Sequence, residues 1–179
     1  MKKVIIKCKV ASRERLVKRL DEIEMKFSEV YWLHDRIYVP RGYKKSMNLP
    51  RLIMRTEMKA VDKPARYKMI LKRHIEDSGI DVVEETPVGD YVAAAKTTLQ
   101  LGFKPLTEVA RRRQELKISD GVMMYIDNID GNKGQFVKLE SELMEGESVE
   151  ELQKDLASTL AVFGENNIVD TAYADLDFS

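Results

Sequence analysis

Charged side chains that could bind an anion lie inside segments expected to be strands. They are spread over several such segments: Arg55, Lys68, Lys72, Arg111, Arg113, Lys138 and Glu140. In a sheet with one buried face, charges at alternate positions ordinarily mark the side that faces water. A closed sheet gives a second interpretation, because a barrel of about eight strands can enclose one small ligand and inward cations would select an anion. The residues alone leave both interpretations open.

Other kinds of chemistry lack the residues that they need. The sequence has no Gly-rich phosphate loop, no G-x-S-x-G and no H-E-x-x-H motif. The two histidines, His34 and His74, are far apart, and neither has a cysteine or a second histidine near it, which argues against a zinc site. Cys8 is the only cysteine, so an internal disulfide is excluded and a reducing cytoplasm is expected.

The elements that must position these residues can be predicted from periodicity and caps. Strand-like alternation covers residues 4–10, 28–39, 51–58, 65–74, 80–86, 104–116, 122–127 and 135–143. Ser12, Asp90 and Ser148 are expected to cap three helices. The first helix has its apolar positions at Leu16, Val17, Leu20 and Ile23, the second spans 91–101, and the third ends at Gly164. Helices set between groups of strands favour an antiparallel α+β fold.

Length and composition narrow the class of protein. A chain of 179 residues without a linker predicts a single domain over residues 1–179. Lys plus Arg and Asp plus Glu each number 30, so no whole-chain field would hold a nucleic acid or an anionic membrane. No apolar run approaches the ~20 residues of a membrane span. We therefore expect a soluble protein.

The order of the segments resembles the CYTH superfamily, also called triphosphate tunnel metalloenzymes. This superfamily includes class IV adenylate cyclases and thiamine triphosphatases. The run LGFKPLTEVARRRQEL at 101–116 is similar to a family strand with two inward basic residues, and MMYIDNIDGNKGQFVKLE at 123–140 to the strand pair that follows. Further matches are RLIMR at 51–55, YKMILK at 67–72, Glu85 before PVGD, and TAYADL at 171–176. The resemblance covers nearly the whole chain and implies an eight-stranded antiparallel β-barrel with flanking helices.

The resemblance also implies roles for individual residues. Phosphate would be bound by Lys7, Arg55, Lys72, Arg111, Arg113 and Lys138. Lys9 and Lys72 would take part in catalysis, and Glu85, Asp127 and Glu140 would hold Mg²⁺ or Mn²⁺. Arginine forks suit phosphate oxygens, and Mg²⁺ prefers oxygen ligands. The segment Asp35 to Tyr38 is one residue longer than the family's D-x-Y-F, so no role is carried onto Tyr38.

Several acids of the family pattern are absent from this chain. The family's E-x-E-x-K reads Ile5-Ile6-Lys7-Cys8-Lys9, and its "FvEiE" reads Phe136-Val137-Lys138-Leu139-Glu140. Ile53 and Val83 replace a further basic and a further acidic residue of the pattern. The matched inward positions then hold seven cations against three anions, an excess that is prohibitive without partners. We expect a bound polyanion, together with water inside the barrel, to act as the partners of these cations.

Two functions follow from these departures. The first is binding of a triphosphate-containing ligand, such as a nucleotide, thiamine triphosphate or inorganic tripolyphosphate, with weakened or lost metal-dependent catalysis. An ammonium group can neutralise phosphate charge but cannot act as a Lewis acid. The alternative is an active class IV adenylate cyclase-like enzyme or triphosphatase that uses magnesium or manganese. Extensive contact with RNA is not expected. The chain is expected to form a homodimer.

Overall fold

The computed structural model describes residues 2–44, 49–60, 62–75, 80–131, 134–165 and 167–169. The strands of this part are β1 (Lys2–Lys9), β2 (Tyr31–Pro40), β3 (Arg51–Met58), β4 (Arg66–Ile75), β5 (Ile80–Val88), β6 (Phe103–Ser119), β7 (Val122–Ile129) and β8 (Gly134–Glu142). The helices are α1 (Arg13–Glu22), α2 (Tyr91–Gln100) and α3 (Val149–Val162). The predicted TAYADL match at 171–176 lies outside the described residues.

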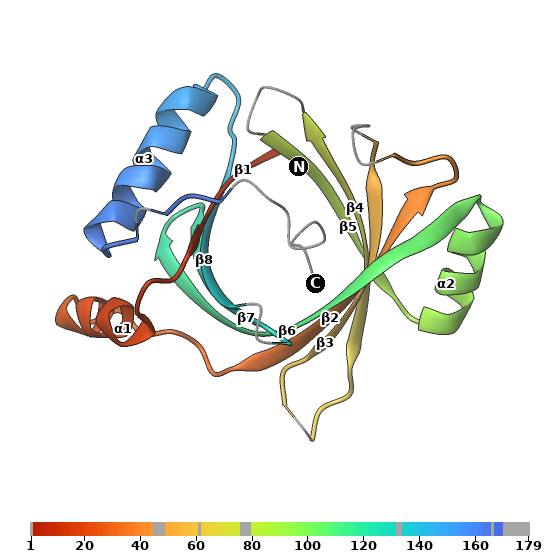
Figure 1. Cartoon of the computed structure of the whole chain (residues 1–179), viewed down its shortest axis with the longest axis horizontal. Coiled ribbons are helices and arrows are strands. Elements are labelled where there is room, and N and C mark those ends of the chain that lie inside the picture. The colour runs from red at the N-terminus through yellow and green to blue at the C-terminus, as the bar shows by residue number, and fades with distance from the viewer. Residues whose placement is uncertain are drawn as a thin grey trace.

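The strands form a closed antiparallel barrel (Figure 1). Around the barrel their order is β1-β5-β4-β3-β2-β6-β7-β8, with every neighbouring pair antiparallel. β1 closes it by pairing along most of its length with β8, from Lys3 to Lys9, and only from Lys2 to Val4 with β5. The expected eight-stranded antiparallel barrel with three helices is confirmed.

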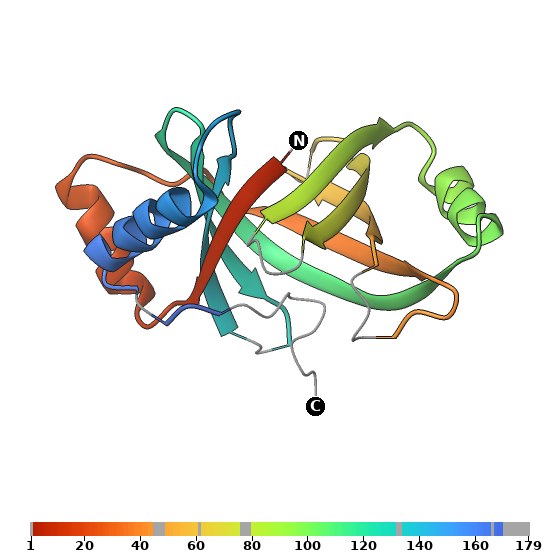
Figure 2. The ribbon, with the colours of Figure 1, turned by 90° about the horizontal axis from the view of Figure 1, so that it is seen from above.

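The main apolar core lies outside the barrel wall, beneath helices. Leu16 and Leu20 of α1 and Leu156 and Leu160 of α3 pack on one group of outward side chains. That group includes Val4, Ile6, Cys8, Met124, Ile126, Val137 and Leu139. Figure 2 shows α1 and α3 together at one end of the molecule and α2 at the other. Because side chains alternate along a strand, covering these positions turns the intervening residues into the barrel.

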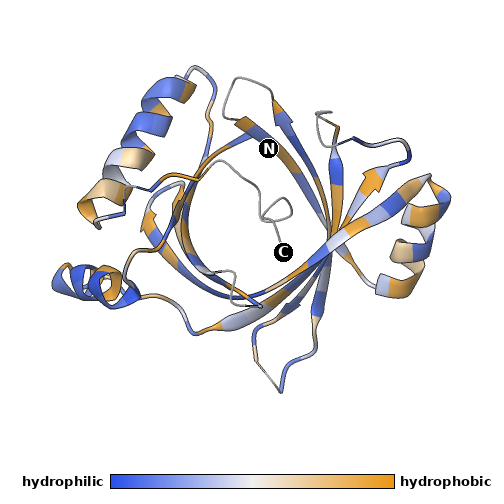
Figure 3. Ribbon diagram, viewed as in Figure 1, coloured by the Kyte–Doolittle hydropathy of each residue, from blue (hydrophilic) through white to orange (hydrophobic). Residues whose placement is uncertain are grey.

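A second apolar cluster lies under α2. Tyr38, Leu52 and Met54 of β2 and β3 are buried, with Tyr91 and Ala94 of α2 packed against them. Figure 3 shows the resulting alternation of hydrophilic and hydrophobic residues along the strands. Inside the barrel the described apolar contacts are fewer and centre on a buried cluster of Ile37, Val109, Ile129 and Phe136.

The predicted helix caps are confirmed. The side chains of Ser12, Asp90 and Ser148 accept hydrogen bonds from backbone amides three residues later, at Arg15, Ala93 and Glu151. Each bond satisfies one of the amides that a helix start leaves without an internal partner. In the described part of the chain, none of the helices is both long and apolar enough to cross a membrane.

Some boundaries differ from the prediction. β2 begins at Tyr31 rather than at Ser28, because the Ser28 amide and hydroxyl both bond to the Glu115 backbone and anchor this connection on β6. β6 continues to Ser119, three residues further than expected. Ile23, expected on the apolar face of the first helix, is the C-cap of α1 and is exposed, because the buried face of α1 is already formed by Leu16 and Leu20.

Candidate functional site

The interior of the barrel is lined with charged side chains from all eight strands. On β1 the outward positions pack under α1 and α3, so Lys3 and Lys7 face inward. By register, the inward positions of the other strands include the residues that the sequence singled out: Arg55 on β3, Lys72 on β4, Glu85 on β5, Arg111 and Arg113 on β6, Asp127 on β7, and Lys138 and Glu140 on β8. The interpretation as a closed sheet with a polar interior is the one that the structure supports.

A continuous ionic chain crosses four neighbouring strands of this wall. The guanidinium of Arg55 donates two hydrogen bonds to the Asp35 carboxylate, at 2.7 and 2.9 Å. Arg111 donates to the same carboxylate at 2.8 Å, and its Nε lies 3.6 Å from Asp127. Arg113 donates twice to Asp127, at 2.6 Å in each bond. Two carboxylates thus hold three arginines in fixed orientations.

Both carboxylates of this chain are strongly stabilised in their charged form. Asp35 is 4% exposed and Asp127 is fully buried. Burial by itself would raise the pKa of each carboxyl group. Arg111 and Arg55 outweigh burial at Asp35, Arg113 does so at Asp127, and both pKa values are held well below their usual range. The chain is therefore ionised throughout the pH range in which proteins ordinarily work.

The structure corrects the predicted charge balance of the interior. The sequence comparison set seven cations against three anions, but Asp35 and Asp81 also face the interior and pair with three of those cations. Each of these three cations therefore has a carboxylate partner within the protein, and a bound polyanion is not required to hold the arginines. Tyr38 packs outside under α2, since it follows the inward Asp35 by three positions, an odd number that reverses the face.

A second cluster surrounds Lys138 on β8. Its ammonium contacts Glu140 and lies 4.8 Å from the centre of the Tyr125 ring, which Arg113 also approaches at 4.4 Å. Burial lowers the pKa of Lys138 to about 7, although Glu140 opposes this shift. Lys7 is the direct cross-strand partner of Lys138, so two lysines face each other where the family pattern has two glutamates.

The remaining predicted residues lie at separate places. Lys72 pairs with Asp81 at 2.7 Å, and Glu85 with Lys68 at 3.3 Å. Lys9 is exposed at the end of β1, six residues from Lys3, or about 20 Å in an extended strand. Since Asp81 is the cross-strand partner of Lys3, the structure does not bring the backbones of Lys9 and Lys72 together.

The three predicted metal ligands do not form a ready cation site in this arrangement. Both oxygens of Asp127 accept from Arg113, Glu140 contacts Lys138 and Lys3, and Glu85 contacts Lys68. Within the described ranges, no group of three His, Cys, Asp or Glu side chains is placed to hold a metal ion. The donor set therefore does not fit a divalent ion as it stands, and the metal role of these carboxylates remains a prediction.

Two interior residues were missed because motif matching gave them no role. Asp35 is separated by 20 residues from Arg55 and by 76 from Arg111, and only the register of β2 with its neighbours brings them together. Asp81 had an available signal, because the adjacent strands expected at 65–74 and 80–86 form a hairpin that sets it opposite His74.

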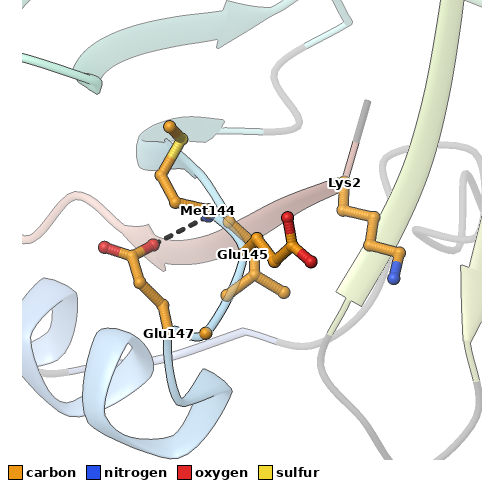
Figure 4. Close-up of a pocket in the computed structure, with 6 residues that line it drawn as sticks. Lys2, Met144, Glu145 and Glu147 are labelled. Atoms are coloured by element: carbon orange, nitrogen blue, oxygen red, sulfur yellow. Dashed lines mark hydrogen bonds between the residues drawn. The ribbon is translucent and has the colours of Figure 1, made fainter.

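One surface pocket lies away from these clusters. It has a volume of about 470 Å³ and is lined by Lys2 and by residues 143–147, which connect β8 to α3 (Figure 4). The Met144 amide donates to the Glu147 side chain within this loop. With two exposed glutamates and one lysine, this pocket is a poor site for an anion.

Comparisons with known proteins agree with this architecture. The PH1819 protein of Pyrococcus horikoshii OT3 has a TM-score of 0.83 at 19% identity, with 97% of each chain covered. A "putative adenylate cyclase" of Vibrio parahaemolyticus scores 0.81 at 16% identity, covering 97% of this chain and 96% of that one. An adenylyl cyclase homologue of Hippeastrum, described as having a dominant triphosphatase activity, scores 0.62 at 14% identity over 97% and 93% of the two chains.

At these identities the structural neighbours show the fold alone. No curated protein sequence matches this chain. The sequence pattern of the CYTH domain, however, matches residues 1–172, nearly the full length. With the closed barrel and its charged interior, this match identifies the chain as a member of the CYTH family.

Proposed function

We propose that the barrel interior binds a triphosphate-containing anion and that metal-dependent catalysis is weakened or lost. The ligand would be a nucleotide, thiamine triphosphate or inorganic tripolyphosphate. The observation that carries this proposal is the cross-strand pair of Lys7 and Lys138 inside the barrel. Glu140 already contacts Lys138, and a phosphate would place further negative charge beside both ammonium groups.

The same pair supports binding without a metal. In the family pattern these positions carry carboxylates, which would help to hold a divalent ion. Lysines there neutralise phosphate charge directly but supply no Lewis acid and no metal-bound water. Arg55, Arg111, Arg113 and Lys72 add donors elsewhere on the inner surface of the barrel, although each is also bonded to a carboxylate.

Calorimetry with tripolyphosphate, ATP and thiamine triphosphate tests this function. We expect tripolyphosphate to bind in the presence of EDTA, and added Mg²⁺ to leave its affinity unchanged or to lower it by complexing the ligand. Replacing Lys7 by Met should weaken binding about tenfold or more, since a charge-assisted contact contributes roughly 1.5–3 kcal/mol. Lys2→Met, an exposed neighbour on β1, is the matched control.

The alternative function is an active triphosphatase or adenylate cyclase-like enzyme that uses Mg²⁺ or Mn²⁺. It is favoured by the triphosphatase activity described for the Hippeastrum neighbour. Phosphate release and cyclic nucleotide formation, measured with each metal, distinguish the two functions. Rapid metal-dependent turnover by the wild type would reject our first proposal in favour of this one.

We also infer a cytoplasmic location and a homodimer. The buried Cys8 is a free thiol, which suits a reducing compartment. Exposed apolar side chains on α2 and just after it, at Val92, Leu99 and Leu101, form a surface that a second copy could cover.

A further inference from the structure

A three-residue cluster occupies the inner face of the β4–β5 pair. The Asp81 carboxylate accepts from the Lys72 ammonium at 2.7 Å, and its other oxygen lies 3.1 Å from Nδ1 of His74. His74 and Asp81 are direct cross-strand partners, and His74 follows Lys72 by two positions on the same face of β4. Asp81 therefore fixes His74 beside a lysine that is predicted to bind phosphate.

The geometry defines which edge of the His74 ring is available for other contacts. A carboxylate can only accept, so Nδ1 carries the hydrogen of this bond. The second nitrogen, Nε2, is then the atom that a ligand could meet. An aspartate that orients a histidine through Nδ1 while Nε2 works on a substrate is a widespread arrangement in enzymes.

The pairing of His74 with Asp81 contributes little to folding stability. The side chain of His74 is 55% exposed, and that of Lys72 is 35% exposed. Ion pairs at such exposed positions contribute little to folding, and Lys72 already provides Asp81 with a partner. The cationic groups nearest in the register are Lys3 on β1, opposite Asp81, and Arg51 on β3, opposite Lys72. Lys72, Arg51 and Lys3, which also contacts Glu140, could therefore meet an anion at this site.

We propose that His74, as an imidazolium, is a ligand-contacting residue whose Nε2–H donates to a phosphate oxygen of the anion held by Lys72, with Asp81 as its positioning residue. This inference rests on the proposed function. It assigns one end of the anion to the β4–β5 side of the barrel, where the pattern of the family gave a role to Lys72 alone.

The chain has two histidines, which makes the first test simple. His34 lies on the outer face of β2, where its Nε2 is 2.9 Å from the Glu108 carboxylate, and it serves as an internal control. In protein labelled with ¹⁵N-histidine, tripolyphosphate should shift the Nε2 resonance of His74 and leave both resonances of His34 in place. The variants H74N and H34N assign the signals.

A pair of conservative variants separates binding from structure. The amide nitrogen of Gln can stand in for Nε2, and that of Asn for Nδ1. If Nε2 contacts phosphate, H74N should weaken tripolyphosphate binding about three- to tenfold, the value of one ordinary hydrogen bond, and H74Q should retain most of the affinity. If His74 only pairs with Asp81, the asparagine variant should be the better substitute, and the inference is wrong. The control variant H34N should bind tripolyphosphate with the affinity of the wild type.

The failure of this inference can be told from the failure of the proposed function. Suppose that tripolyphosphate binds the wild type without moving the His74 resonances, and that the Lys7→Met variant does not bind it. That result overturns the role of His74 alone. Absence of any tripolyphosphate binding to the wild type overturns both.

Discussion

Asp35 is the residue whose replacement should most clearly separate stability from ligand binding. It accepts three hydrogen bonds from two arginines, Arg55 and Arg111, at 2.7 to 2.9 Å. The variant Asp35→Asn keeps the shape of the side chain and removes its charge. Removing one partner of a buried ion pair typically costs about 3–5 kcal/mol, because the remaining charges stay buried without compensation. For a chain of this size, that corresponds to a decrease in Tm of roughly 6–20 °C.

The same substitution should strengthen anion binding. The guanidinium groups of Arg55 and Arg111 would lose their carboxylate and would gain most from a phosphate. A single added charge-assisted hydrogen bond of about 1.5 kcal/mol raises the affinity roughly tenfold. Urea unfolding and calorimetry with tripolyphosphate, each on wild type and variant, measure the two effects. Ligand should also raise the Tm of the variant more than that of the wild type, because it binds the folded state more tightly.

Glu108 is the matched control for Asp35. Its carboxylate also bridges two basic side chains, Arg36 and His34, but it lies on the outer surface and is 48% exposed. Glu108→Gln should therefore cost no more than about 1 kcal/mol and leave tripolyphosphate binding unchanged. The reasoning would be refuted if Asp35→Asn were as stable as Glu108→Gln, or if it bound tripolyphosphate no better than the wild type.

A double-mutant cycle identifies the source of the loss. Arg55→Met removes one of the two charges that Asp35→Asn leaves uncompensated. The double variant should therefore be less destabilised than the sum of the two single variants, by 0.5–3 kcal/mol or so, as expected for residues in direct contact. Additive effects would mean that the bond between Arg55 and Asp35 contributes nothing beyond the packing of the two side chains.

Three further predictions concern pH, metal and assembly. Although burial opposes the shift, Arg111 and Arg55 lower the pKa of Asp35 in the folded protein. The contribution of Asp35 to folding stability is therefore present above its unfolded pKa of about 3.9 and is lost as the pH falls from there through its lower folded pKa. The free energy of unfolding of Asp35→Asn should accordingly fall less steeply with acid than that of the wild type. The double variant Lys7→Glu with Lys138→Glu should acquire Mg²⁺-dependent tripolyphosphate binding, because two added carboxylates would join Asp127 and Glu140; a magnesium titration that leaves its affinity unchanged contradicts this. Light scattering should give twice the 20.6 kDa of one chain, and Val92→Glu with Leu99→Glu on α2 should return the mass to that of a monomer.

The fold was predictable because its signals are local. Alternation along each strand placed Ile6 and Cys8 on one face of β1 and Lys7 on the other, and the helix packing confirms this division. Caps at Ser12 and Asp90 are set by residues within three positions, so a short window contains all the information that they need. Barrel closure is less local, and it came from the resemblance rather than from periodicity.

The partners of the charged residues could not be predicted in the same way. A family motif identifies positions that bind a ligand in other members and is silent on internal ion pairs. Asp35 stabilises Arg55 and Arg111 only because β2 lies between β3 and β6 in the register observed. Burial inside the barrel lowers the pKa of Lys138, and Arg113, two strands away on β6, lowers it further. Such relations require the strand order and the register together.

The two kinds of cation inside the barrel should therefore serve different purposes. On the wall formed by β3, β2, β6 and β7, arginines are held bidentately by buried carboxylates, and any anion that binds them must compete with Asp35 or Asp127. On the wall formed by β4, β5, β1 and β8, the carboxylates pair with lysines instead. The side chains of Lys72 and Lys68 are each more than one third exposed. An ammonium in contact with water can turn toward a phosphate at little cost, whereas a buried guanidinium cannot leave its carboxylate without leaving both charges buried and unpaired. Affinity for an anion should depend first on the lysines, and folding stability on the arginines.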